Sequence, residues 1–203
     1  MIVVFDRQHF GKPSGPDPGA QVDLNNDGQF GTGEQEANLT PFYYLAARRI
    51  LEKLGHSAVV LDNGWYSSRH KKANAIARAN PHQRVAYCAC HINAGAGNYA
   101  AFIHDERSVG GKRLASVLAG AFADAKISGI RKSITRAGNA TNVWKRGYYT
   151  IKGIRSGPAN ISGVCLEPYF LDTEAHQHLT TGEGAQTVGE ALANGLIRWG
   201  AGV

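Results

Sequence analysis

The stretch Arg84–Gly95, RVAYCACHINAG, indicates the fold class and one candidate functional residue. Val85 to Cys90 form a short apolar run bounded by turn-forming residues, which is typical of a buried strand in an α/β sheet. The run ends at His91, and small and polar residues follow it. A histidine at the carboxyl end of such a strand stands where open α/β sheets bind their ligands. The alternative is a core histidine whose ring nitrogens are bonded to neighbours.

Strand and helix patterns alternate along the rest of the chain. Further strands are predicted at Ile2–Asp6, Ser57–Leu61, Tyr99–His104 and Gly163–Leu166, with one or two more around Val143–Ile151. Helices are predicted at Pro41–Leu54, at Ser67–Ala79, around Leu114–Ala125 and at the C-terminus. Thr40 is the expected N-cap of the first helix. The C-terminal helix has Val188 and Trp199 on one apolar face. This order predicts a single α/β domain: an open, mixed, mostly parallel sheet with helices on both faces.

Composition restricts the classes of partner. The chain has 203 residues, a formal net charge of +6 and a sequence pI near 9.3. A basic surface favours anionic partners such as nucleic acid, acidic lipid or an acidic cell-wall polymer. No apolar stretch approaches the roughly 20 residues that a transmembrane helix needs, and the start MIVVFDRQH is too short and too charged for a signal peptide. We therefore expect no membrane span and no export signal.

The long loop Lys12–Gly33 contains a calcium-loop pattern. Asp23–Gly28 followed by Glu34 fits the spacing D-x-N-x-D-G-x5-E. Prolines at 13, 16 and 18 exclude the helix that should precede an EF-hand loop. We expect a glycine-rich turn with Asx hydrogen bonds, and a calcium loop without its entering helix is the alternative.

Three residues of metal-ligand or acid–base type fall at strand ends. His9, His91 and Glu167 each follow or end a predicted strand, and the carboxyl ends of parallel strands share one sheet edge. Glu34 and Glu36 add carboxylates just before the first helix. Two histidines and one carboxylate are a common catalytic zinc set, which leaves a position open for water.

At these motifs the sequence resembles the zinc-dependent N-acetylmuramoyl-L-alanine amidases of the autolysin and phage-endolysin type (amidase_3-like). The resemblance spans nearly the whole chain and is carried by five segments: Asp6–Gly11, Glu34 with Asn38-Leu39, Arg69–Asn74, Ala89–Ala94 and Glu167–Leu171. It implies an enzyme that hydrolyses the peptidoglycan amide between the lactyl group of N-acetylmuramic acid and L-alanine of the peptide stem.

The resemblance also implies the roles of individual residues. One Zn²⁺ per chain is held by His9, Glu34 and His91, and Glu167 is the catalytic acid/base. A helix that starts as late as Pro41 leaves Glu36 as a second candidate for the carboxylate ligand. Residues 1–203 are then one catalytic domain without a separate wall-binding module. We expect a monomer that binds peptidoglycan and no nucleic acid. It would be made in the cytoplasm without a signal peptide and act on the cell wall, as a phage or prophage lysin does.

Two other classes of function remain open. A Cys–His amidase would use one of the three cysteines, Cys88, Cys90 or Cys165, as nucleophile. These thiols lie inside predicted strands, where small buried side chains are expected rather than thiolates of low pKa. A non-enzymatic, basic nucleic-acid-binding module would leave the His/Glu set without a role.

Overall fold

A six-stranded sheet forms the centre of the described part of the chain. The computed structural model describes residues 1–24, 27–138 and 148–202. The strand order is β2-β1-β3-β6-β4-β5, and only the β4–β6 pair is antiparallel. The strands are β1 (Ile2–Arg7), β2 (Ser57–Leu61), β3 (Val85–Cys90), β4 (Tyr99–His104), β5 (Lys132–Ala137) and β6 (Ile161–Glu167). The predicted mixed, mostly parallel sheet is confirmed.

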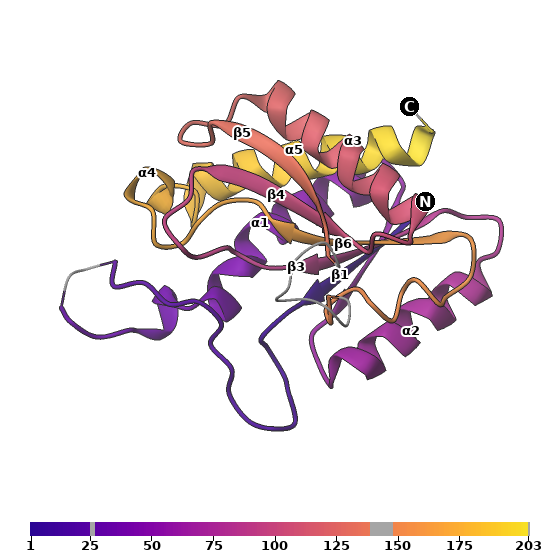
Figure 1. The fold of residues 1–203 in the computed structure, drawn as a ribbon, viewed down its shortest axis with the longest axis horizontal. Helices are drawn as coiled ribbons and strands as arrows, with labels where there is room; N and C mark the ends of the chain where they lie inside the picture. The colour runs from indigo at the N-terminus through magenta and orange to yellow at the C-terminus, as the bar shows by residue number, and fades with distance from the viewer. Residues whose placement is uncertain (25–26, 139–147, 203) are drawn as a thin grey trace.

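Helices cover both faces of this sheet (Figure 1). They are α1 (Glu36–Lys53), α2 (Tyr66–Ala79), α3 (Val109–Ala125), the short α4 (Glu174–Gln177) and α5 (Gly182–Ala201), with a 3₁₀ turn η1 (Thr32–Glu34). Alternate residues of a strand point to opposite faces. Val3 and Phe5 pack with buried residues of α1, α3 and α5, whereas Ile2 and Val4 pack with Ala73 and Ala77 of α2. No described helix has the length and apolarity to cross a membrane.

Helix α1 begins five residues before the predicted start. Pro41 lies inside it, and Thr40 donates through Oγ1 to the Glu36 carbonyl at 2.6 Å and is not an N-cap. Proline lacks the N–H that would bond the carbonyl four residues earlier. The Arg7 guanidinium supplies the missing donors, since Nε and Nη2 lie 3.0 and 2.8 Å from the Ala37 carbonyl oxygen. A side chain distant in sequence therefore allows the helix to begin at Glu36.

The region before β6 also differs from prediction. The structure has an edge strand, β5, at Lys132–Ala137, where no strand was predicted. Residues 143–147 lie outside the described residues, and 148–151 form turns. Strand β5 is only partly buried, so its sequence lacks the apolar alternation by which strands are recognised.

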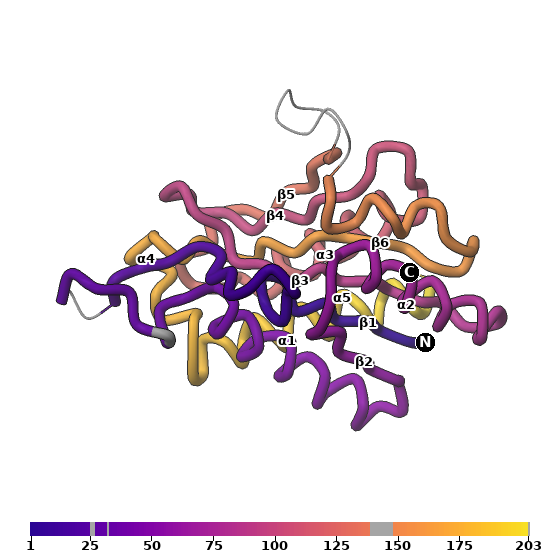
Figure 2. Tube along the Cα trace, turned by 90° about the horizontal axis from the view of Figure 1, so that it is seen from below, coloured from indigo at the N-terminus to yellow at the C-terminus, as the bar shows by residue number. Residues whose placement is uncertain are grey.

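The topology brings the candidate residues to one edge. Strands β1, β3 and β6 are parallel neighbours in the sheet. His9 follows β1, His91 follows β3 directly, and Glu167 is the last residue of β6. The indigo segment between β1 and α1 extends beyond the sheet (Figure 2). Its residues 18–22 return to the start of α1, where Val22 and Glu36 donate through their backbone N–H groups to the carbonyls of Glu34 and Ala20.

Candidate metal centre and acid–base residue

His9 stands on a turn with an uncommon backbone conformation. Its φ is +62°, in the left-handed region that non-glycine residues seldom adopt. The buried Arg69 fixes this turn, because its guanidinium donates to the carbonyl of Arg7 at 2.6 Å and to the carbonyl of Phe10. Such strain persists only where surrounding contacts impose it. The turn is thus held from inside the protein.

The charge of Arg69 is balanced by Asp6 in β1. Nη1 of Arg69 lies 2.6 Å from Oδ1 of Asp6, and both side chains are fully buried. Tyr87 also donates to Asp6. Burial raises the pKa of Asp6, while Arg69 and Tyr87 act in the opposite direction. A buried charge that loses its partner is costly, so this ion pair ties β1, α2 and the His9 turn together.

His91 and Glu36 are also held through backbone contacts. The His91 N–H donates to the Leu166 carbonyl at 3.0 Å, and Tyr43 donates through its hydroxyl to the His91 carbonyl at 3.0 Å. The Glu36 carboxylate accepts from the Ala20 N–H on Oε2 at 2.8 Å and from the Ile92 N–H on Oε1 at 3.0 Å. Glu36 is only 3% exposed, so its direction is set by these bonds.

Gly19 permits the close packing around these side chains. Its φ is +69°, and a Cβ there would lie 2.5 Å from Glu36 Oε2 and 2.9 Å from the His9 ring. Any other residue would therefore push the carboxylate and the imidazole out of place.

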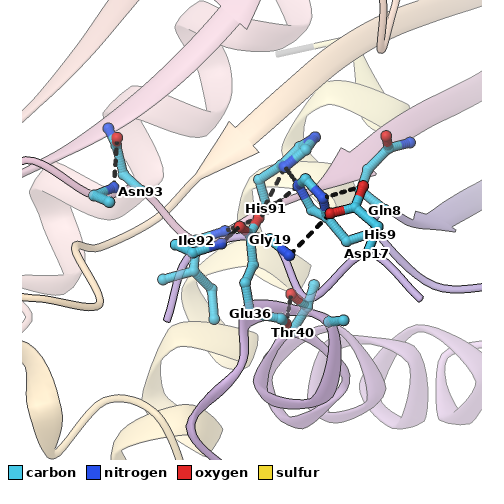
Figure 3. A network of polar contacts seen from close by, with 12 residues as sticks. Gln8, His9, Asp17, Gly19, Glu36, Thr40, His91, Ile92 and Asn93 are labelled. Carbon is cyan, nitrogen blue, oxygen red and sulfur yellow. Dashed lines mark hydrogen bonds and ion pairs between the residues drawn. The ribbon is translucent and has the colours of Figure 1, made fainter. Parts of the chain in front are cut away.

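Three ligand atoms converge at this point (Figure 3). His9 Nε2 lies 3.1 Å from His91 Nδ1 and 3.5 Å from Glu36 Oε1, and His91 Nδ1 lies 2.8 Å from the same oxygen. Tetrahedral zinc with bonds of about 2.0–2.1 Å keeps its ligand atoms about 3.3 Å apart. The side chains present therefore fit a zinc ion in both identity and spacing.

Asp17 orients the His9 ring. Its Oδ2 lies 3.0 Å from His9 Nδ1, and a carboxylate at this distance favours the neutral tautomer that has its proton on Nδ1 and its lone pair on Nε2. Lys12 and the Gly19 N–H bind the same carboxylate. Burial would raise the pKa of Asp17, but the bonds from Lys12 and His9 outweigh it and lower the pKa to about 2. A carboxylate behind a ligating histidine is a recurrent feature of metal sites.

The pKa values of the three converging groups shift with their surroundings. Burial lowers the pKa of His9, against the attraction of Glu36. Burial would also lower the pKa of His91, but its bond to Glu36 outweighs that and raises it. Burial would raise the pKa of Glu36, yet the bond from His91 lowers it. Glu36 therefore stays ionised near neutral pH and suits a cation.

The structure does not bring Glu34, the expected carboxylate ligand, to this cluster. The Glu34 carboxylate accepts from the Leu24 N–H on Oε1 and from the Gly31 N–H on Oε2, both at 2.6 Å. Backbone donors of the preceding loop thus hold it there. The early start of α1 turns Glu36 toward the histidines instead, so Glu36, the second carboxylate candidate of the sequence, is the one that lies with His9 and His91.

Glu167 lies on the same edge and has few polar partners. It is 8% exposed, its Oε1 accepts from the Tyr148 hydroxyl at 3.3 Å, and its Oε2 has no hydrogen-bond partner among the described residues. Burial raises its pKa to about 7, against the attraction of His91. Arg155, an arginine near β6 in the sequence, has its Nε 3.7 Å from Oδ2 of a different carboxylate, Asp105. A carboxyl group with this pKa can both accept and donate a proton near neutral pH.

A cleft of ≈ 410 Å³ opens beside the cluster. His9 lines it from the turn after β1, and Lys12 and Asp17 line it from the long loop. Gln35, Ala37 and Asn38 line it from the N-cap and first turn of α1. An extended substrate could therefore approach His9 along this cleft.

Three residues that hold the site in place were not predicted as site residues from the sequence. Asp17 lies in a loop without periodicity, where no pattern singles it out. Tyr148 lies in a segment that was predicted as a strand. Arg69 belongs to a segment that resembles the amidases, but its sequence neighbours Lys71 and Lys72 are also basic, and such a run gives no sign of burial.

Comparisons with solved structures identify the fold. No family model matches the sequence, and no curated protein matches it. N-acetylmuramoyl-L-alanine amidase AmiC2 of Nostoc punctiforme matches at a TM-score of 0.70 and 19% identity, covering 98% of this chain and 96% of that one. The catalytic domain of the amidase CwlV from Bacillus (Paenibacillus) polymyxa matches at a TM-score of 0.66 and 20% identity, covering 98% of this chain and 97% of that one. The catalytic domain of the CD27L endolysin, which targets Clostridia difficile, matches at a TM-score of 0.60 and 12% identity, covering 98% of this chain and 97% of that one. The chain thus has the fold of N-acetylmuramoyl-L-alanine amidase catalytic domains over almost its whole length.

Proposed function

We propose that this protein hydrolyses the amide bond between the lactyl group of N-acetylmuramic acid and L-alanine of the peptidoglycan stem, with zinc as cofactor. The observation that carries the proposal is the convergence of His9, Glu36 and His91 at the edge of a sheet whose fold is shared with peptidoglycan amidases. The three side chains come from three different segments, so a chance cluster on one helix or loop is not the explanation.

His9 Nε2, His91 Nδ1 and Glu36 Oε1 would hold the zinc ion, and Asp17 would keep the His9 ring in the required tautomer. When bound, zinc supplies Lewis-acid polarisation of a carbonyl and lowers the pKa of water. Two neutral imidazoles and one carboxylate leave a net positive site, which suits the negative charge that develops on the carbonyl oxygen.

Glu167 would carry the proton. With a pKa near 7 it can take a proton from the attacking water and deliver it to the leaving L-alanine nitrogen. The Tyr148 hydroxyl on Oε1 fixes one carboxylate oxygen and leaves Oε2 for the proton. Glu167 is not among the converging ligand atoms, as a proton carrier requires.

The surroundings of the cysteines disfavour the thiol alternative. Cys88, Cys90 and Cys165 are buried and free, and burial raises the pKa of each thiol. A catalytic cysteine instead needs a lowered pKa and access to substrate. The formal charge of +6 would favour binding to anionic wall polymers. We retain as proposals a single catalytic domain, a monomer and a lysin that acts on the cell wall.

The test is digestion of purified peptidoglycan by the zinc-loaded protein, followed by detection of new L-alanine amino ends. A chelator should abolish their release and added zinc should restore it. Glu167→Gln should fold, keep its zinc and lose about 10²–10⁴ in turnover. Activity that survives the chelator but is lost on thiol alkylation would overturn the proposal in favour of a cysteine nucleophile.

A further inference from the structure

A second cavity lies between α2 and the segment that follows Tyr148. It measures ≈ 280 Å³, and its main lining residues are Tyr66, Ser67, His70, Tyr149, Lys152 and Arg155. Two cations and two aromatic rings line it, and none of its lining residues is acidic. An open pocket with this composition favours an anionic group carried on an organic body.

The wall that carries the cations is firmly attached to α2. His70 Nε2 lies 2.9 Å from the Thr150 carbonyl oxygen and donates to it, and Asn74 donates through Nδ2 to the Gly153 carbonyl at 3.1 Å. His70 is only 6% exposed, and burial lowers its pKa, so the ring is neutral and serves as a donor. The cavity is therefore formed before any ligand arrives.

The two cations differ in how they are engaged. Arg155 Nε lies 3.7 Å from Asp105 Oδ2, which leaves the rest of its guanidinium fork for another acceptor. The Lys152 ammonium lies 5.6 Å from the centroid of the exposed Tyr149 ring, and no ion pair to it occurs among the described residues. Lys152 is thus the cation most available to a ligand.

Both walls of the cavity continue into the candidate active site. Tyr148, which donates to Glu167, directly precedes the cavity residue Tyr149. On the opposite wall the Tyr66 ring lies under the Lys12 ammonium, 4.6 Å from its centroid, and Lys12 binds the Asp17 that orients His9. A ligand in this cavity would be adjacent to the reacting centre.

We infer that this cavity binds a free carboxylate of the substrate's stem peptide through Lys152 and Arg155. The inference rests on the proposed function, because the amide that is cut lies at the start of that peptide. A chain that extends from the scissile bond past Glu167 reaches the cavity, and a carboxylate is the anionic group that such a peptide carries. Lys152 and Arg155 would then select substrates by charge as well as position them.

The test compares two muramoyl-tripeptide substrates, one with free stem carboxylates and one with these converted to amides. The zinc-loaded wild-type protein should favour the acid form by about tenfold in kcat/KM, the size of one charge-assisted contact. Lys152→Gln should reduce this preference to about twofold or less, because kcat/KM falls more for the acid form than for the amide form. Lys112→Gln, an exposed lysine on α3, is the matched control and should keep the full preference.

Binding of the tripeptide alone, followed by NMR shifts at the Ser67 and Gly153 amides, separates this inference from the proposed function. Acid-selective binding of the tripeptide that Lys152→Gln weakens about tenfold, together with no hydrolysis of the muramoyl-tripeptide, would support the cavity and refute the hydrolase. Equal hydrolysis and equal binding of both forms would refute the cavity alone. Tighter binding of glycerol 3-phosphate than of the acid tripeptide would assign the cavity to wall-polymer phosphate and also overturn the inference.

Discussion

Replacing the buried carboxyl group of Glu167 should change how stability depends on pH. The pKa of Glu167 is about 7 in the folded protein, against an ordinary value of 4.5. Below pH 4.5 the group is protonated in both the folded and unfolded states, so it has no effect on the pH dependence. Between about pH 4.5 and 7 the unfolded chain releases its proton first, and the free energy of unfolding falls.

The size of this loss follows from the two pKa values. One pKa unit corresponds to 1.36 kcal/mol, so ionised Glu167 destabilises the folded protein by about 3 kcal/mol above pH 7. No discount for solvent screening is needed, because the side chain is only 8% exposed. Glu167→Gln keeps the shape and removes the titration. Relative to the wild-type protein, the variant should gain about 3 kcal/mol between pH 4.5 and 8.

Urea unfolding of both metal-free proteins across this pH range measures the difference. Titrating groups that do not interact with Glu167 are common to both proteins and cancel, provided that the m-values agree, whereas His91 and Glu36 are coupled to Glu167 and contribute to the difference. A difference that is independent of pH would mean that Glu167 titrates normally. A wild-type protein that gains stability relative to Glu167→Gln as the pH rises would mean that the carboxylate has a cationic partner.

Other substitutions test the surroundings of the site. Asp17→Asn should weaken zinc binding by about 10–100-fold in competition titrations, because His9 loses the carboxylate that sets its tautomer; unchanged affinity would remove Asp17 from the site. Arg69→Gln should lower the free energy of unfolding by about 3–5 kcal/mol in urea titrations, since Asp6 is left buried and uncompensated; a loss below about 1 kcal/mol would contradict this. Calorimetry of the zinc-loaded protein should show no calcium binding below millimolar concentration, because both Asp23 carboxylate oxygens already accept backbone N–H groups; micromolar binding that Asp27→Ala abolishes would refute it.

Every strand of the sheet except β5 was predictable, because these strands are short apolar runs that end at turn residues. Parallel pairing then places His9, His91 and Glu167 at one edge without any knowledge of contacts. The carboxylate ligand was not predictable in the same way. It depends on where α1 begins, and that depends on Arg7 replacing the donor that Pro41 lacks.

Long-range polar contacts account for the other differences between prediction and structure. Arg69 stands in a run of basic residues, which usually indicates a solvated face, yet its partner Asp6 lies 63 positions away. Asp17 acquires its role only when the long loop folds back on His9. Neither contact follows from local periodicity, because each joins residues from different elements.

The most direct test of the metal centre is the zinc content of Glu36→Gln and Glu34→Gln, measured after dialysis against a weak chelator. The wild-type protein should hold one zinc ion per chain. Glu36→Gln should lose it, since the oxygen that faces both histidines loses its negative charge. Glu34→Gln should keep it, because the Leu24 and Gly31 N–H groups hold the Glu34 carboxylate outside the His9–Glu36–His91 cluster. Zinc lost from Glu34→Gln but retained by Glu36→Gln would contradict the assignment of Glu36.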